Sequence, residues 1–79
     1  MHKLHAISDN PDTNAGLELV EISTQLAHTP EELRQTLENI GPEIGIIIIT
    51  SSLAAKSADI LATYRDKNKL PLITIIPDP

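Results

Sequence analysis

Five side chains with oxygen donors suggest the most recognisable chemistry in this chain: Asp9, Asp12, Thr50, Ser51 and Ser52. The two acids follow the apolar segment 4–8, and the three hydroxyl residues follow the isoleucine-rich segment 44–49. Carboxylate and hydroxyl oxygens are hard ligands, which Mg²⁺ prefers in octahedral geometry. If the fold brings the two segments together, these side chains predict a magnesium-binding rim, and phosphoryl chemistry is its most direct use.

The end of the segment 44–49 argues against phosphoryl chemistry. A receiver-type phosphorylation domain needs a phosphate-accepting aspartate at the end of its central strand, where this chain has Ile49 and Thr50. No lysine follows the last apolar segment, 70–76, either. Turn acids and helix caps are the simpler interpretation of the same side chains. A receiver-like or small-ligand-binding regulatory domain with an acidic magnesium-binding rim is therefore the alternative hypothesis.

Composition excludes several other classes of site. The formal net charge of −5, from 11 acidic and 6 basic residues, repels nucleic acid. The sequence has no cysteine, which excludes disulfides, zinc–thiolate sites and a cysteine nucleophile. His2, His5 and His28 lack paired ligand spacing, and no glycine-rich phosphate loop follows the first apolar segment. We therefore expect no catalytic residue, cofactor, metal ligand or nucleic-acid partner.

The apolar segments predict the strands. Ile44–Thr50 contains four consecutive isoleucines, and a strand that is apolar on both faces belongs in a parallel sheet covered by helices above and below. The segments 4–8 and 70–76 are also predicted as strands. The segment 22–28 is predicted as an edge strand, because residues 23–25 are polar.

Three helices are predicted between these strands, over 13–20, over 30–40, and from a cap at Thr50 or Ser51 to about Lys67, with a turn over 9–14 before the first. The second has the clearest start, because Thr29, Pro30 and Glu32 form a capping box with proline at the first helical position. Gly41 and Pro42 end it, the glycine being free to adopt positive φ. One face of the third helix is expected to contain Leu53, Ser57, Ile60, Leu61 and Tyr64.

The alternation of strands and helices predicts one α/β domain over residues 1–79. Right-handed crossovers make it a small Rossmann-like or flavodoxin-like three-layer sandwich, with a four-stranded parallel sheet of order 2-1-3-4. Ligands of such sheets bind beyond the carboxyl ends of the strands. We define this region as the strand-end rim, which also includes Asn10 and residues 77–78. No stretch of about 20 apolar residues is present, so we expect no direct membrane insertion.

Four segments, in this order and spacing, resemble the F subunit of the rotary V-type and archaeal A-type ATPases over essentially the whole chain. They are Ser8-Asp9-Asn10-Pro11-Asp12-Thr13 with Gly16, then residues 29–32, 44–50 and 71–77. Two positions depart from the family pattern. Family members commonly have glycine where Ser8 stands, and a valine-rich second strand where residues 23–25 are polar.

The resemblance implies a non-catalytic accessory subunit of the central rotor stalk. Such a protein binds the coiled-coil D subunit, turns with it inside the catalytic headpiece, and helps couple ATP hydrolysis or synthesis to proton or sodium transport. It is cytoplasmic and peripheral to the membrane. Family members continue into a C-terminal helix, which is absent from a sequence that ends at Pro79.

Loops at the strand ends carry most function in such sheets, so the rim supplies the expected partner contacts. They are Asp9, Asn10, Pro11, Asp12, Thr50, Ser51 and Ser52. A third interpretation is an isolated domain that dimerises through its polar edge strand, near residues 23–27.

Overall fold

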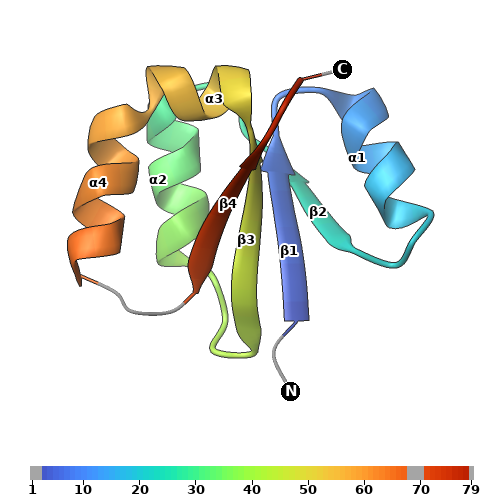
Figure 1. Ribbon diagram of the computed structural model, residues 1–79, viewed down its shortest axis with the longest axis horizontal. Helices are drawn as coiled ribbons and strands as arrows, with labels where there is room; N and C mark the ends of the chain where they lie inside the picture. The colour runs from blue at the N-terminus through green and yellow to red at the C-terminus, as the bar shows by residue number, and fades with distance from the viewer. Residues whose placement is uncertain (1–2, 68–70, 79) are drawn as a thin grey trace.

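Strands and helices alternate along the chain in the computed structural model, which describes residues 3–67 and 71–78 (Figure 1). The strands are β1 (Lys3–Ser8), β2 (Ser23–Leu26), β3 (Ile44–Thr50) and β4 (Leu72–Ile76). The helices are α1 (Pro11–Glu18), α2 (Pro30–Glu38), α3 (Ser51–Lys56) and α4 (Ala58–Lys67). The sheet is parallel throughout and has the order β2-β1-β3-β4, as the sequence predicts.

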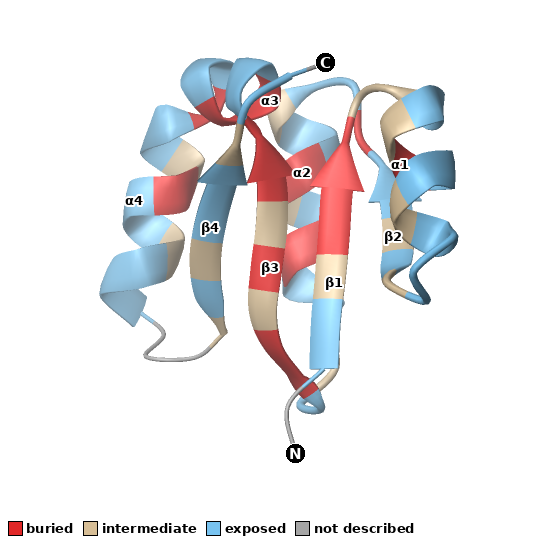
Figure 2. Cartoon of the chain, turned by 45° about the vertical axis from the view of Figure 1, so that its right-hand side comes forward, coloured by how far each residue is buried: buried red, intermediate tan, exposed pale blue. Residues whose placement is uncertain are grey.

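The register of the central strands sorts their side chains onto two faces. His5 of β1 lies opposite Ile47 of β3, and Ile7 lies opposite Ile49. Because side chains alternate along a strand, these residues share one face, and the residues between them share the other. We call the first the covered face, because α2 and α4 pack on it. Figure 2 shows α2 behind β3 and β1.

The hydrophobic core lies on the covered face. Ile7, Ile47 and Ile49 are fully buried there, together with Leu33 of α2 and Leu53 of α3. Ile60 and Tyr64 of α4 are half-buried against the same cluster. The apolar residues predicted to share one face of the third helix therefore pack on the core, although the structure divides them between α3 and α4.

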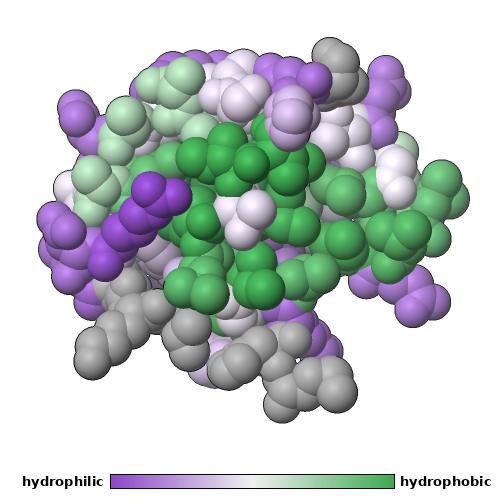
Figure 3. Space-filling model, viewed as in Figure 1, coloured by the Kyte–Doolittle hydropathy of each residue, from purple (hydrophilic) through white to green (hydrophobic). Residues whose placement is uncertain are grey.

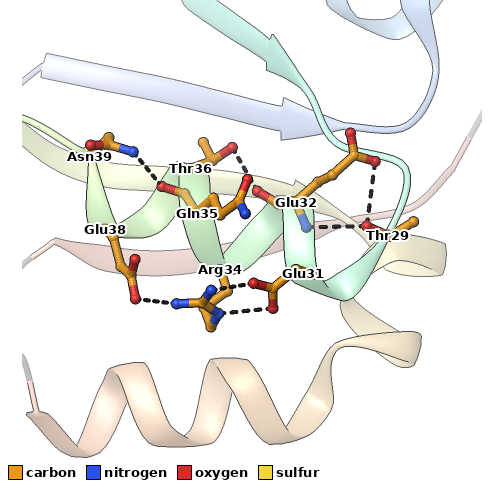
Figure 4. A network of polar contacts seen from close by, with 8 residues as sticks. All are labelled: Thr29, Glu31, Glu32, Arg34, Gln35, Thr36, Glu38 and Asn39. Atoms are coloured by element: carbon orange, nitrogen blue, oxygen red, sulfur yellow. Dashed lines mark hydrogen bonds and ion pairs between the residues drawn. The ribbon is translucent and has the colours of Figure 1, made fainter.

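Helix α2 begins as its capping box predicts. The backbone N–H of Glu32 donates to the Thr29 hydroxyl at 3.1 Å (Figure 4). The Glu32 carboxylate accepts from the backbone N–H of His28 at 3.2 Å. Farther along the helix, Arg34 forms exposed ion pairs with Glu31 and Glu38. Proline at the first position needs no hydrogen-bond partner, so the start of this helix is satisfied locally.

Three local predictions are wrong. Helix α1 begins at Pro11, within the expected turn, because Asn10 caps it. The expected third helix is two helices, separated at Ser57, which is the C-cap of α3. Gly41 does not have positive φ; the residue in the left-handed region is Glu21, with φ of 65° in the turn before β2.

The two edge strands differ in character. β2 is polar, as predicted, but shorter than the expected segment 22–28, whereas β4 is apolar and lies between Pro71 and Pro77. Leu70, the expected first residue of the last strand, and residues 68–69 of the preceding connection lie outside the described residues. Among the residues that are described, no helix combines the length and apolar character needed to cross a membrane.

Candidate functional site

The strand-end rim contains two separate groups of interacting residues. The first lies between β1 and α1, where Asn10 accepts from the backbone N–H of Asp12 at 2.8 Å and of Thr13 at 3.4 Å. Beneath it the buried Ser8 hydroxyl donates to the Asn14 side chain at 2.8 Å. These bonds fix the start of α1 and leave Pro11 and Asp12 exposed at its first turn.

Asp9 connects this group to α3. Its carboxylate lies 3.6 Å from the ammonium group of Lys56, which also donates to the backbone carbonyl of His28 at 3.0 Å. Lys56 therefore joins the ends of β1 and β2 to the last turn of α3. The contact is partly exposed, so we assign it a modest role in stability.

The second group joins the end of β4 to the start of α3. The Asp78 carboxylate accepts from the backbone N–H of Ser52 at 3.1 Å and from the Ser51 hydroxyl at 3.4 Å, and the backbone N–H of Asp78 donates back to that hydroxyl. Hydrogen bonds from the side chain and backbone of Ser52, and from Ser51, lower the pKa of Asp78. Asp78 thus caps α3, for which the preceding Thr50 provides no side-chain cap.

Thr50 is the one expected contact residue that is buried in the structure. It is only 2% exposed, so it supports the rim from below and offers no surface. Within the described part of the chain, no hydrogen bond or ion pair joins Asp9 or Asp12 to Ser51 or Ser52. No three described histidine or acidic side chains gather as metal ligands, and His2 lies outside the described residues. Asp9 instead forms an ion pair, and Asp78 caps a helix.

A groove of about 750 Å³ lies between α2 and α4, away from the rim. Its apolar lining includes Ile40 and Ile60, and its charged lining carries both signs, from Arg34 and Lys67 on one hand and Asp59 on the other. This mixture favours no class of charged ligand, so the groove adds no chemistry to the site.

The most distinctive surface is the sheet face opposite the covered face. Helix α1 packs there on the β1–β2 side, as shown by the bonds from Ser8 to Asn14 and from Thr24 to Glu18. Within residues 3–67 and 71–78, no helix lies over β3 and β4 on this side (Figures 1 and 2). We call the uncovered part the open face; its residues are Leu4, Ile46, Ile48, Leu72, Thr74 and Ile76.

The open face is apolar and accessible. Leu72 is 58% exposed and Leu4 is 38% exposed, while Ile46, Ile48 and Ile76 are half-buried. In Figure 3 the apolar residues form a continuous green area across the middle of the molecule. Scattered exposed apolar residues are ordinary, but a contiguous apolar area marks an interaction site. The expectation that helices cover both faces of the isoleucine strand is therefore met on one face only.

Sequence reasoning missed the open face, although the topology contained the signal. In the order 2-1-3-4, only the connection from β1 to β2 runs in the direction that places its helix on this face. The connections to β3 and to β4 run the other way, and right-handed crossovers put their helices on the opposite face. One helix cannot cover four strands, so exposed isoleucine side chains follow from the predicted strand order.

Comparison with known proteins identifies the family. The family model for the ATP synthase (F/14-kDa) subunit matches residues 4–79, nearly the full length of the chain. The chain belongs to this family. Among solved structures, this member of the F-subunit family is similar to the F subunit of the V-type ATP synthase from Archaeoglobus fulgidus. The two share 22% sequence identity over 95% of this chain and 96% of that chain, with a TM-score of 0.72.

The structural likeness confirms the fold of the F-subunit chain, a four-stranded parallel α/β sheet. A search of curated protein sequences finds no match. The family match makes this chain a member of a family of accessory subunits of a multi-subunit ATP synthase, in agreement with the resemblance in its sequence motifs.

Proposed function

We propose that this chain is a non-catalytic subunit of the central rotor stalk of a V-type or A-type ATPase. It binds the coiled-coil D subunit, turns with it inside the catalytic headpiece, and helps couple ATP hydrolysis or synthesis to proton or sodium transport. The observation that carries this proposal is the family match over residues 4–79. The protein then acts in the cytoplasm, held at the periphery of the membrane by its complex.

The arrangement of the rim supports a role in binding rather than catalysis. Asp9 is paired with Lys56, Asn10 caps α1, and Asp78 caps α3. Side chains committed to such contacts hold loops in place, which suits a preformed protein-binding surface. The accessible members of the rim, which we propose as contacts for the D subunit, are Asp9, Asn10, Pro11, Asp12, Ser51 and Ser52.

Titration calorimetry of this chain against the purified D-subunit coiled coil tests the proposal. We expect saturable one-to-one binding by the wild-type chain. Ile47→Asp places a charge at a fully buried core position, so this variant serves as the unfolded control and should not bind. A folded wild-type chain that does not bind the D subunit would refute the rotor function.

A matched pair of variants tests the rim. Asp12 and Asp59 are both exposed acids in the first turn of a helix, but only Asp12 lies on the rim. Asp12→Lys should weaken binding to the D subunit, whereas Asp59→Lys should leave it unchanged while disturbing its own helix start to a similar extent. Equal affinities for both variants would remove this part of the rim from the interface.

A further inference from the structure

The width and length of the open face match those of one short α-helix. It extends from β1 across β3 to β4, which spans two strand spacings, or about 10 Å. An α-helix with its side chains is about 10 Å in diameter. The five residues of β4 extend over about 16 Å, which matches about 11 residues of helix. A helix placed there would complete the layer that α1 begins.

The charges on the open side of the molecule indicate which kind of helix would bind there. The open face is formed and bordered by β1, α1, β2 and β4, which lie within residues 3–26 and 71–78, and by β3, which carries no charged residue. Residues 3–26 and 71–78 contain five acids and one lysine, Lys3. Residues 27–67, which form most of the covered side, contain six acids and four bases. The open side is therefore the more acidic half of the molecule. Complementary partners carry basic residues beside their apolar stripe.

A second copy of the chain fits this surface poorly. Two copies packed face to face would bring two acidic sides together, which costs binding energy. The open face measures only about 10 by 16 Å along its strand axes, whereas a specific interface buries about 800 Å² of accessible surface on each partner, so other parts of the molecule must contribute to such an interface. A helix from a long partner avoids this limit, because it continues past the sheet and contacts the strand-end rim as well.

We propose that the open face binds one amphipathic helix of the D subunit, with an apolar stripe on Leu4, Ile46, Ile48, Leu72 and Ile76 and with basic residues along its flanks. This inference rests on the proposed function, since the D subunit supplies the helix. It places the apolar centre of the interface on the sheet and leaves the rim as its polar border. Such an arrangement is typical of protein interfaces, which have an apolar core and a polar edge.

Three variants of β4 test the proposal by calorimetry against the purified D-subunit coiled coil. Leu72→Ser removes an exposed apolar side chain from the open face, and Thr74→Lys adds a charge to the same face. Ile75→Ser is the matched control, because Ile75 is 46% exposed on the same strand but belongs to the covered face. Circular dichroism confirms that each variant is folded before titration.

We expect Leu72→Ser to raise Kd about tenfold, because it removes one apolar side chain from the interface. Thr74→Lys should raise Kd to a similar extent, because it places a charge beneath the apolar stripe of the bound helix. Ile75→Ser should change Kd less than about twofold. Raising the ionic strength should weaken wild-type binding, because the flanking charges attract.

Three outcomes would overturn the inference. If the wild-type chain binds the D subunit and both open-face variants bind equally well, the interface lies elsewhere, while the proposed function stands. If the wild-type chain does not bind at all, the proposed function and the inference fail together. If sedimentation shows a wild-type dimer that Leu72→Ser dissociates, the open face belongs to a second copy.

Discussion

Ile47 and Ile48 are neighbours in β3, yet they lie in opposite environments. Ile47 is fully buried beneath α2 and α4, whereas Ile48 points to the open face and is only half-buried. The same contrast runs through the central strands, since the buried cluster includes Ile7, Ile47 and Ile49 on one side, while Leu4, Ile46 and Ile48 remain accessible on the other. Hydrophobicity alone does not distinguish the side that stabilises the fold from the side available for binding.

The direction of the crossovers explains this difference. A chain that winds once in one direction and twice in the other must leave part of one sheet face uncovered, whatever residues its strands carry. Substitutions on each face test whether the covered face contributes more to stability than the open face.

Truncation of β3 should have the largest effect. Ile47→Ala leaves a cavity in the core and should lower the free energy of unfolding by about 3 kcal/mol. Ile48→Ala removes a side chain that water already reaches, so we expect a loss of about 1 kcal/mol. Urea denaturation followed by circular dichroism measures both values. Equal losses would show that the open face is packed as tightly as the covered face.

Loss of a helix cap should have the next largest effect, and it should be similar on the two faces. Asn10 caps α1 and Thr29 caps α2 through the same kind of side-chain bond. Asn10→Ala and Thr29→Ala should each destabilise the fold by about 1 kcal/mol. The controls Asn10→Asp and Thr29→Ser keep the acceptor and should restore most of the loss. A much larger cost at Asn10 would mean that α1 is held mainly by its cap.

Protonation of His5 should produce a smaller, pH-dependent effect on the covered face. Burial lowers the pKa of His5, and hydrogen bonding to Gln25 opposes that change. A lowered pKa means that the unfolded chain takes up the proton more readily. Stability is therefore fully present above pH 6.5 and declines as the pH falls towards the lower folded pKa.

Urea midpoints measured across this range test the effect. His5→Asn should remove the decline, while His28→Asn, which changes an exposed histidine, should retain it. A decline that persists in His5→Asn would assign the pH dependence to other groups.

Removal of the Arg34 ion pairs should have the smallest effect. The three charged side chains are exposed on α2 (Figure 4), and exposed ion pairs contribute little because water screens them. Arg34→Gln should leave the urea midpoint unchanged within experimental error, at low and at high salt. A clear loss of stability that disappears in high salt would show that this surface contributes more than its exposure indicates.

The fold was largely predictable because its signals are local and consistent. Apolar runs identified β1, β3 and β4, and the alternation of strands with helices led to the parallel order. Errors in the predicted helix boundaries occurred where one residue pattern is compatible with two local structures. Asn10 followed by Pro11 is typical of a turn, but it also provides an N-cap and a first helical residue. The break at Ser57 has no glycine or proline to mark it.

The candidate site was less predictable, because it depends on contacts between distant segments. The pairing of Asp9 with Lys56 and the capping of α3 by Asp78 join residues far apart in the sequence. The hydroxyl of Thr50 fits the same pattern as those of Ser51 and Ser52, but the strand buries it. Exposure of the open face depends on the side of the sheet on which each crossover helix lies. The residue types in the strands do not indicate that side.

The prolines on either side of β4 have a consequence for the free chain. A parallel sheet with an apolar edge strand invites addition of further strands, which is a route to fibrous aggregates. Proline has no N–H to donate, so Pro71 and Pro77 confine any added strand to the five residues between them. They act as gatekeepers. They allow a small acidic protein to carry an accessible apolar surface before assembly without polymerising along its edge.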